Sequence, residues 1–162
     1  MIEKLDKLLA SKRKDYYRLL QPGVRENELS AFENKFSIVL PNDFKELYIW
    51  RDGKNPMSSS PIQDNRTFMT LKEIESTKEE LDGMIGYDFE DPKYWRASWV
   101  PFLENGGGSY LCLDVAAEDG GAINQLIGFW KRDSDRPIEY KSISEWLQKL
   151  TVSIEDGTIE LC

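Results

Sequence analysis

The chain has 162 residues, with 21 basic and 29 acidic side chains, no histidine and a formal net charge of −8 at pH 7. This length fits one domain over residues 1–162, and a negative charge of this size disfavours binding to nucleic acids and to anionic membranes. We therefore expect a protein partner, with neither a nucleic acid nor a membrane as target, and the charge suits a basic partner. The sequence leaves the oligomeric state open.

Apolar residues at helical spacing predict a first helix over residues 1–20, which Pro22-Gly23 ends. The charges mixed into this segment differ from the unbroken apolar run of a signal peptide. The two cysteines, Cys112 and Cys162, belong to no CxxC pair, so we expect neither a zinc nor a redox motif. Together these features predict a cytoplasmic protein.

Two further helices are expected before residue 54. Asn27 is a suitable N-cap for the first, and Pro41 fits the first turn of the second. Asp52-Gly53 is predicted to end that helix, with Gly53 as a left-handed cap. After a loop over residues 54–65 and a short strand near 67–69, Thr70 and Glu73 form the capping box of a helix that ends near Gly83 or Gly86.

The second half of the chain carries the strand signals. Residues 99–103 and 110–114 flank the turn 105–108, and Asn-Gly is a strong hairpin signal. Further strands are expected at 123–130 and 138–140, then a helix capped by Ser142 or Ser144, with a small hairpin or a strand and tail over 152–161. Helices first and hairpin-linked strands later predict an α+β fold with a single, mostly antiparallel sheet, flanked by N-terminal helices and a C-terminal helix.

The absence of histidine removes the Ser-His-Asp triad, the Cys-His pair and the histidine metal site. We therefore expect no enzyme activity, no catalytic residues, no cofactor and no metal. Glycines 106–108 lack a following Gly-Lys-Ser/Thr and lead into a strand, so a turn is preferred to a phosphate loop. A cation site at Asp114, Glu118 and Asp119 matches no EF-hand, and a solvated turn is the preferred interpretation. Glu104 and Asp114, which flank one hairpin, leave a carboxylate-dependent hydrolase as a further hypothesis.

The most distinctive surface feature lies between residues 73 and 95, where acidic side chains outnumber basic ones and aromatic residues follow. One interpretation is a solvated helix and loop. The other is a negative patch that attracts a basic partner and holds it through aromatic rings. The predicted contact residues are Glu73, Glu75, Glu79, Asp82, Asp88, Glu90, Asp91, Tyr94 and Trp95.

Three groups of motifs in order carry a family resemblance. The first is Leu40-Pro41-Asn42-Asp43-Phe44 followed by Asp52-Gly53, and the second is the strand, Gly-rich turn and strand over residues 99–114. The third is Ser144-Glu145-Trp146-Leu147 in the last helix. Over about residues 24–150 this pattern resembles the SUKH superfamily. Asp52 stands where Asn is commoner in the family.

The resemblance implies an α+β domain with one curved sheet packed by helices. We expect this core at about residues 24–150, preceded by the N-terminal helix at 1–20 and followed by a short extension at 151–162. It implies no enzyme activity. Bacterial members resemble immunity proteins that neutralise polymorphic toxins, often nucleases or deaminases, and fungal members resemble regulators of cell-wall synthesis. Our first hypothesis is therefore an immunity-type protein that binds a basic toxin domain. The alternative is a regulatory scaffold in cell-wall or cell-envelope assembly.

Overall fold

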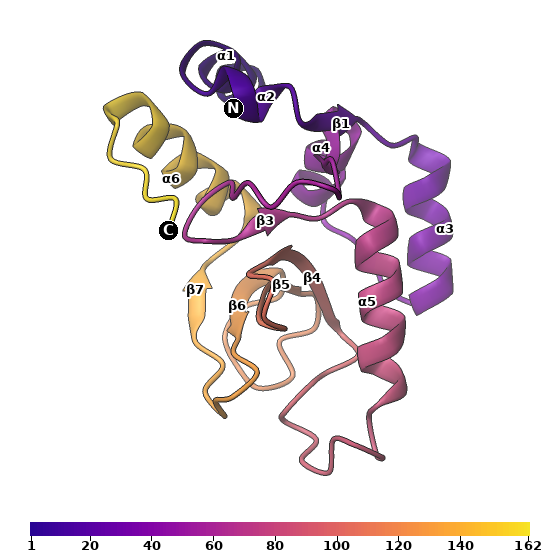
Figure 1. Cartoon of the computed structure of the whole chain (residues 1–162). Coiled ribbons are helices and arrows are strands. Elements are labelled where there is room, and N and C mark those ends of the chain that lie inside the picture. The colour runs from indigo at the N-terminus through magenta and orange to yellow at the C-terminus, as the bar shows by residue number, and fades with distance from the viewer.

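The computed structural model describes all residues 1–162 and shows an α+β fold built around a five-stranded antiparallel sheet (Figure 1). The strands follow one another in the sheet in chain order. They are β3 (Thr67–Phe68), β4 (Trp99–Glu104), β5 (Tyr110–Asp114), β6 (Gln125–Phe129) and β7 (Ile138–Tyr140). The predicted fold class is therefore confirmed, including the hairpin that joins β4 to β5.

A second sheet of two strands accompanies the first, so the prediction of a single sheet is incomplete. It pairs β1 (Leu20–Pro22) with β2 (Arg51–Lys54) in antiparallel order. Six helices complete the fold, and none is long and apolar enough to cross a membrane. They are α1 (Ile2–Lys12), α2 (Lys14–Tyr17), α3 (Glu26–Phe36), α4 (Asn42–Trp50), α5 (Leu71–Gly83) and α6 (Ile143–Asp156).

The N-terminal helix predicted over residues 1–20 is interrupted. Arg13 separates α1 from α2 with backbone angles φ −133° and ψ 57°, outside the helical region. Its guanidinium donates to the carbonyl oxygens of Pro61 and Ile62, both at 2.8 Å. Residues 20–22 then form β1 instead of a last helical turn. These contacts are remote in the chain, so local periodicity could not reveal them.

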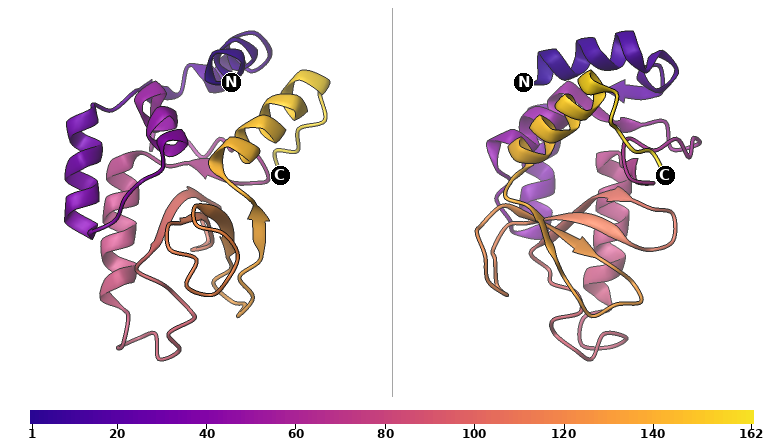
Figure 2. Two further views of the ribbon diagram at one scale, coloured as in Figure 1. Left: turned by 180° about the vertical axis from the view of Figure 1, so that it is seen from behind. Right: turned by 90° about the vertical axis from the view of Figure 1, so that its left-hand side faces the viewer.

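The hairpin predicted over residues 152–161 is wrong, because α6 continues to Asp156. Its buried stripe runs on through Leu150 and Ile154 at helical spacing. Gly157 ends the helix in the left-handed conformation, with φ 72°. α6 packs beside α1 (Figure 2), where Lys4 of α1 pairs with Glu155 of α6, and its Trp146 ring contacts Phe102 of β4.

Gly53 is not the cap of α4, which ends at Trp50, but lies within β2. Its φ is +64°, and an added Cβ would lie 2.5 Å from the backbone of Met69 and Thr70. Two segments of backbone therefore approach here more closely than any side chain allows. The neighbouring Asp52 accepts a hydrogen bond from the amide of Leu71 at 2.6 Å, which joins β2 to the start of α5.

The larger sheet is rolled, and side chains connect its two edge strands. Arg66, directly before β3, donates to both carboxylate oxygens of Glu139 in β7, at 2.7 and 2.8 Å. Since β3 and β7 are opposite edges of the sheet, this partly buried ion pair closes the roll. The Arg66 guanidinium also covers the ring of Trp130, 5.3 Å from its centre.

Two hydrophobic cores occupy the two faces of this sheet. The larger one has 27 buried residues and joins the helices to residues such as Phe102 and Leu113. The smaller one consists of Trp95, Trp99, Cys112, Ile127 and Phe129. The segment 84–98, which links α5 to β4, supplies Trp95 to the smaller core, with Ile85, Phe89 and Tyr94 packed against it. This packing holds the segment 84–98 against the sheet, and several of the predicted acidic contact residues lie in this segment.

Candidate functional site

The site that the sequence predicts lies on α5 and on the segment 84–95 that follows it. We call residues 87–91 the acidic tip, because Asp88, Glu90 and Asp91 are all exposed there. Tyr87 stands among them with 81% of its surface exposed, which makes it the most exposed large ring of the chain. The acidic tip therefore presents three carboxylates and one aromatic ring to solvent.

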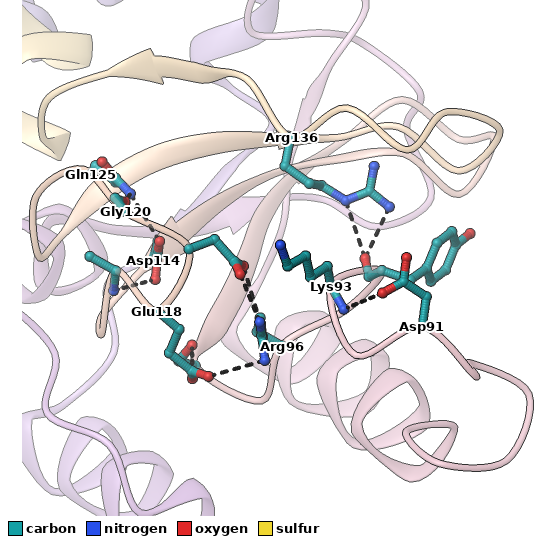
Figure 3. A network of polar contacts seen from close by, with 12 residues as sticks. Asp91, Lys93, Arg96, Asp114, Glu118, Gly120, Gln125 and Arg136 are labelled. Carbon is teal, nitrogen blue, oxygen red and sulfur yellow. Dashed lines mark hydrogen bonds and ion pairs between the residues drawn. The ribbon is translucent and has the colours of Figure 1, made fainter.

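The base of the acidic tip is anchored by Tyr94. The Tyr94 hydroxyl donates to the carbonyl oxygen of Lys131 at 2.8 Å. The Arg136 guanidinium donates to the backbone carbonyl oxygen of Tyr94 at 2.9 and 3.2 Å (Figure 3). Arg136 also lies 4.4 Å from the centre of the Phe129 ring. The ring of Phe89 packs on Tyr94 with centres 4.6 Å apart. Tyr94, one of the predicted contact residues, is thus half exposed and also holds the acidic tip in position.

A second anchor joins this segment to the loop between β5 and β6. Arg96 donates to Asp119 at 2.7 Å and pairs with Glu118 at 3.4 Å (Figure 3). The hydrogen bond from Arg96 lowers the pKa of the Asp119 carboxyl. The hydroxyl of Ser98 donates to Glu118 at 2.9 Å. The C-terminal side of the acidic tip is therefore held by two loops of the sheet, the β5–β6 loop and the β6–β7 connection.

The predicted acidic residues of α5 have partners within the chain. Glu73 completes the capping box, since its carboxylate accepts from the Thr70 amide at 2.7 Å. Glu75 and Glu79 both pair with Lys35 of α3, at 2.7 and 3.1 Å. These three carboxylates hold the helix in place, and Glu75 and Glu79 remain partly exposed.

Asp82 and Trp95 belong to the interior contacts of this region. The Trp95 ring is only 1% exposed, so its prediction as an exposed anchor ring is wrong. Its indole N–H donates to Asp82 at 2.8 Å, and Asp82 also accepts from the buried ammonium of Lys78 at 3.0 Å. Lys78 donates in addition to the carbonyl oxygen of Ala97. Burial lowers the pKa of Lys78, and the Asp82 charge opposes that effect.

Comparison with known protein families identifies the domain. Residues 23–149, most of the chain, match the SMI1 / KNR4 family (SUKH-1). The chain belongs to this family. The resemblance inferred from the sequence over about residues 24–150 is therefore confirmed. Comparison with curated proteins gives no match.

Membership of the SMI1/KNR4 family supports a protein-binding role connected with immunity or with cell-wall assembly. The matched residues run from the segment before α3 into α6, and they include both the acidic tip and its anchors. α1, α2, β1 and the last turns of α6 lie outside the match. The candidate site is therefore part of the SMI1/KNR4 domain itself.

The other carboxylate groups singled out in the sequence serve the fold of this SMI1/KNR4 domain. Glu104 is paired with Tyr110 and Asp114 with Trp99, so the two acids lie at opposite ends of the β4–β5 hairpin and do not face one another. Asp114 is buried and accepts from the Ala117 amide at 2.9 Å and from Gln125 at 3.0 Å (Figure 3). No group of three potential ligands that could hold a metal ion is assembled in the structure.

Sequence reasoning omitted Tyr87 from the contact residues. Its signal was the alternation of aromatic and acidic residues over 87–95, but this pattern has no period that separates buried from exposed rings. The structure makes the separation: Trp95 is buried, Tyr94 is half exposed and Tyr87 is exposed. The surface available to a partner is thus centred on Tyr87, Asp88, Glu90 and Asp91.

Proposed function

We propose that this SMI1/KNR4-family protein is an immunity-type protein that binds a cognate toxin in the cytoplasm and neutralises it without catalysing a reaction. The observation that carries the proposal is the anchored acidic tip, with Asp88, Glu90, Asp91 and Tyr87 exposed together. Family membership supports a protein-binding role of this kind. The toxin that fits this surface best is a basic one, of the nuclease type.

Charge complementarity supplies the mechanism. A nuclease must hold phosphate groups and therefore carries basic side chains at its active site. A protein with a net charge of −8 is attracted towards such a surface, which raises the rate of association. The three carboxylates of the acidic tip would occupy the phosphate positions, so that the substrate is excluded.

Affinity requires more than attraction between charges, because exposed ion pairs contribute little. Tyr87 provides a ring that can be buried in the interface, and aromatic rings are frequent at the sites that dominate binding energy. The anchors at Tyr94 and Arg96 hold the tip before a partner arrives, which reduces the entropic cost of binding. Glu75 and Glu79, already paired with Lys35, would lie at the margin of the interface.

The direct test is co-expression with the product of the adjacent gene. We expect that the chain protects cells from this product and is captured with it, and that the variant Tyr87→Ala loses most of the protection. The matched control is Ile49→Ala, which removes another exposed apolar side chain from a distant helix. Full protection by Tyr87→Ala, or loss of protection in both variants, would contradict the proposed surface.

The alternative function, a regulatory scaffold in cell-wall assembly, rests on the same family membership. It predicts that the adjacent gene product is neither toxic nor neutralised, and that the chain instead co-purifies with a protein of cell-wall synthesis. The co-expression experiment therefore distinguishes the two functions.

A further inference from the structure

A hollow lies where the turn between β4 and β5 meets the segment after β6. Asn105, Gly107 and Ser109 form one wall and residues 130–133 the other, and the volume is about 500 Å³. Ligand pockets in proteins have volumes of about 300–1,000 Å³. The Ser109 hydroxyl accepts from the Lys131 amide at 3.1 Å, which connects the two walls.

Two cations without partners line this hollow. Lys131 and Arg132 are exposed, and neither takes part in any ion pair of the structure. The aliphatic chain of Lys131 lies over Gly108, where an added Cβ would come within 2.9 Å of its Cδ atom. Asp133 is also part of the lining, so the two cations and this carboxylate give the walls a net charge of +1. In a chain with a net charge of −8, this is a locally positive site.

The glycine turn at the edge of the hollow has free backbone donors. Gly106 and Gly108 have φ values of 79° and 86°, and neither of their amides donates to an acceptor within the protein. The amides of Gly107 and Ser109 donate to the side-chain oxygen of Asn105 instead, which fixes the shape of the turn. Free backbone amides in a glycine turn are suited to binding anions. A phosphate loop has its cation directly after the glycines in the chain, whereas Lys131 and Arg132 come from the β6–β7 connection.

Trp130 is the one apolar side chain that lines the hollow. The ring of Trp130 is 39% exposed, and the Arg66 guanidinium lies against it. The ring has room beside the sheet because residue 128 is a glycine, whose added Cβ would lie 3.0 Å from the indole nitrogen. Tryptophan rings in such positions stack with flat ring systems of ligands.

We propose that this hollow binds a small molecule that carries an oxyanion next to a flat ring. The oxyanion lies at Lys131 and Arg132, and the ring packs on Trp130. Charged hydrogen bonds from a lysine and an arginine hold oxyanions more strongly than neutral donors do. This site is separate from the carboxylates of the acidic tip and does not depend on the proposed toxin.

Titration of the ¹⁵N-labelled chain with adenosine monophosphate, followed by amide and indole NMR signals, tests the proposal. We expect saturable shifts at residues 106–109 and 130–132 and at the Trp130 indole. Lys131→Gln with Arg132→Gln should lower the affinity by about tenfold or more, because both cations are lost. The matched control, Lys7→Gln with Lys14→Gln, removes two other exposed lysines without ion pairs and should leave the affinity unchanged.

A parallel titration with inorganic phosphate tests the role of the ring. Phosphate should shift the same amides with an affinity about tenfold lower, since it cannot stack on Trp130. Shifts that spread over lysines throughout the chain would overturn the proposal, as would equal affinities of the wild type and the Lys131→Gln, Arg132→Gln variant. Equal affinities for phosphate and adenosine monophosphate would overturn the assignment of the flat ring.

Discussion

Asp82 was predicted as a contact for a partner, and the structure instead predicts a large effect on stability when it is removed. The side chain of Lys78 is fully buried, and Asp82 is its only carboxylate partner. Asp82 also accepts the indole N–H of Trp95 at 2.8 Å. Asp82→Ala therefore leaves a buried ammonium without a counterion and a buried donor without an acceptor.

Breaking a buried ion pair costs about 3–5 kcal/mol. The Asp82 side chain is 22% exposed, so water can replace part of the interaction, and we expect a loss of about 3 kcal/mol in the free energy of unfolding. For a chain of this length, the melting temperature should fall by about 6–12 °C. Urea unfolding monitored by tryptophan fluorescence measures the change. Asp88→Ala, at an exposed carboxylate of the acidic tip, is the control and should stay within about 0.5 kcal/mol of the wild type.

A double variant separates the unpaired charge from the lost side chain. Lys78→Met in the Asp82→Ala background removes the buried ammonium, so it should recover about 2 kcal/mol of the loss. Wild-type stability of Asp82→Ala would refute the reasoning. A double variant as unstable as Asp82→Ala alone would show that the loss does not come from the unpaired lysine.

Three further predictions concern the fold. Gly53→Ala should lower the free energy of unfolding in urea by about 2 kcal/mol or more, because φ is +64° and the added Cβ meets backbone. The control Gly83→Ala has open space around it and should not destabilise the chain. Equal effects of the two variants would contradict the close approach of the backbone at Gly53. Glu139→Gln should weaken the contact between the sheet edges and increase amide hydrogen exchange in β7. The control Glu46→Gln, at an exposed carboxylate without an ion pair, should leave that exchange unchanged. Amides of β7 that stay protected in the Glu139→Gln variant would argue against a closed roll. Burial raises the pKa of the Cys112 thiol above its ordinary value of 9.0, so above pH 9 the folded state keeps a proton that the unfolded state releases. The contribution of this group to the free energy of unfolding is therefore complete below pH 9 and falls as the pH rises above it. Cys112→Ala should remove this part of the dependence of the free energy of unfolding on pH, and an unchanged dependence would refute the prediction.

Local signals in the sequence predicted the elements that depend on local contacts. The capping box of Thr70 and Glu73 needs only four consecutive residues, and the structure has it. The Asn105-Gly106 turn between two apolar strands is another such case, because its hydrogen bonds lie within the hairpin. The chemistry of these residues restricts the backbone directly, so one sequence is enough to predict them.

The errors arose where distant parts of the chain decide the structure. Gly53 looks like a helix cap in the sequence, but the approach of the backbone at Met69 makes it a strand residue. Arg13 interrupts a continuous helical pattern through contacts with a loop almost fifty residues away. No local pattern contains this information.

The acidic character of the candidate site was visible in the sequence, but the exposure and pairing of its side chains were not. The excess of acidic residues over 73–91 marked the segment that the structure shows to be rich in exposed carboxylates, because composition is visible without a fold. Whether an acid is free or paired depends on residues such as Lys35, which lies on another helix. In the same way, Trp95 and Tyr87 are similar as aromatic residues in the sequence, and only packing against the sheet distinguishes the buried ring from the exposed one.

The central claim is that the acidic tip is the surface that binds the toxin. Its most direct test compares two triple variants by calorimetric titration with the toxin at low salt and at about 0.15 M salt, where the screening length is about 8 Å. One variant is Asp88→Lys, Glu90→Lys and Asp91→Lys, and the other is Glu3→Lys, Glu46→Lys and Asp156→Lys, at exposed acids elsewhere. Each acid-to-lysine substitution raises the net charge by two units, so both triple variants change the net charge from −8 to −2. Only the position of the changed charges differs between them. We predict that the tip variant loses at least about a hundredfold in affinity and the control variant about threefold or less. Wild-type affinity of the tip variant at low salt would contradict the account.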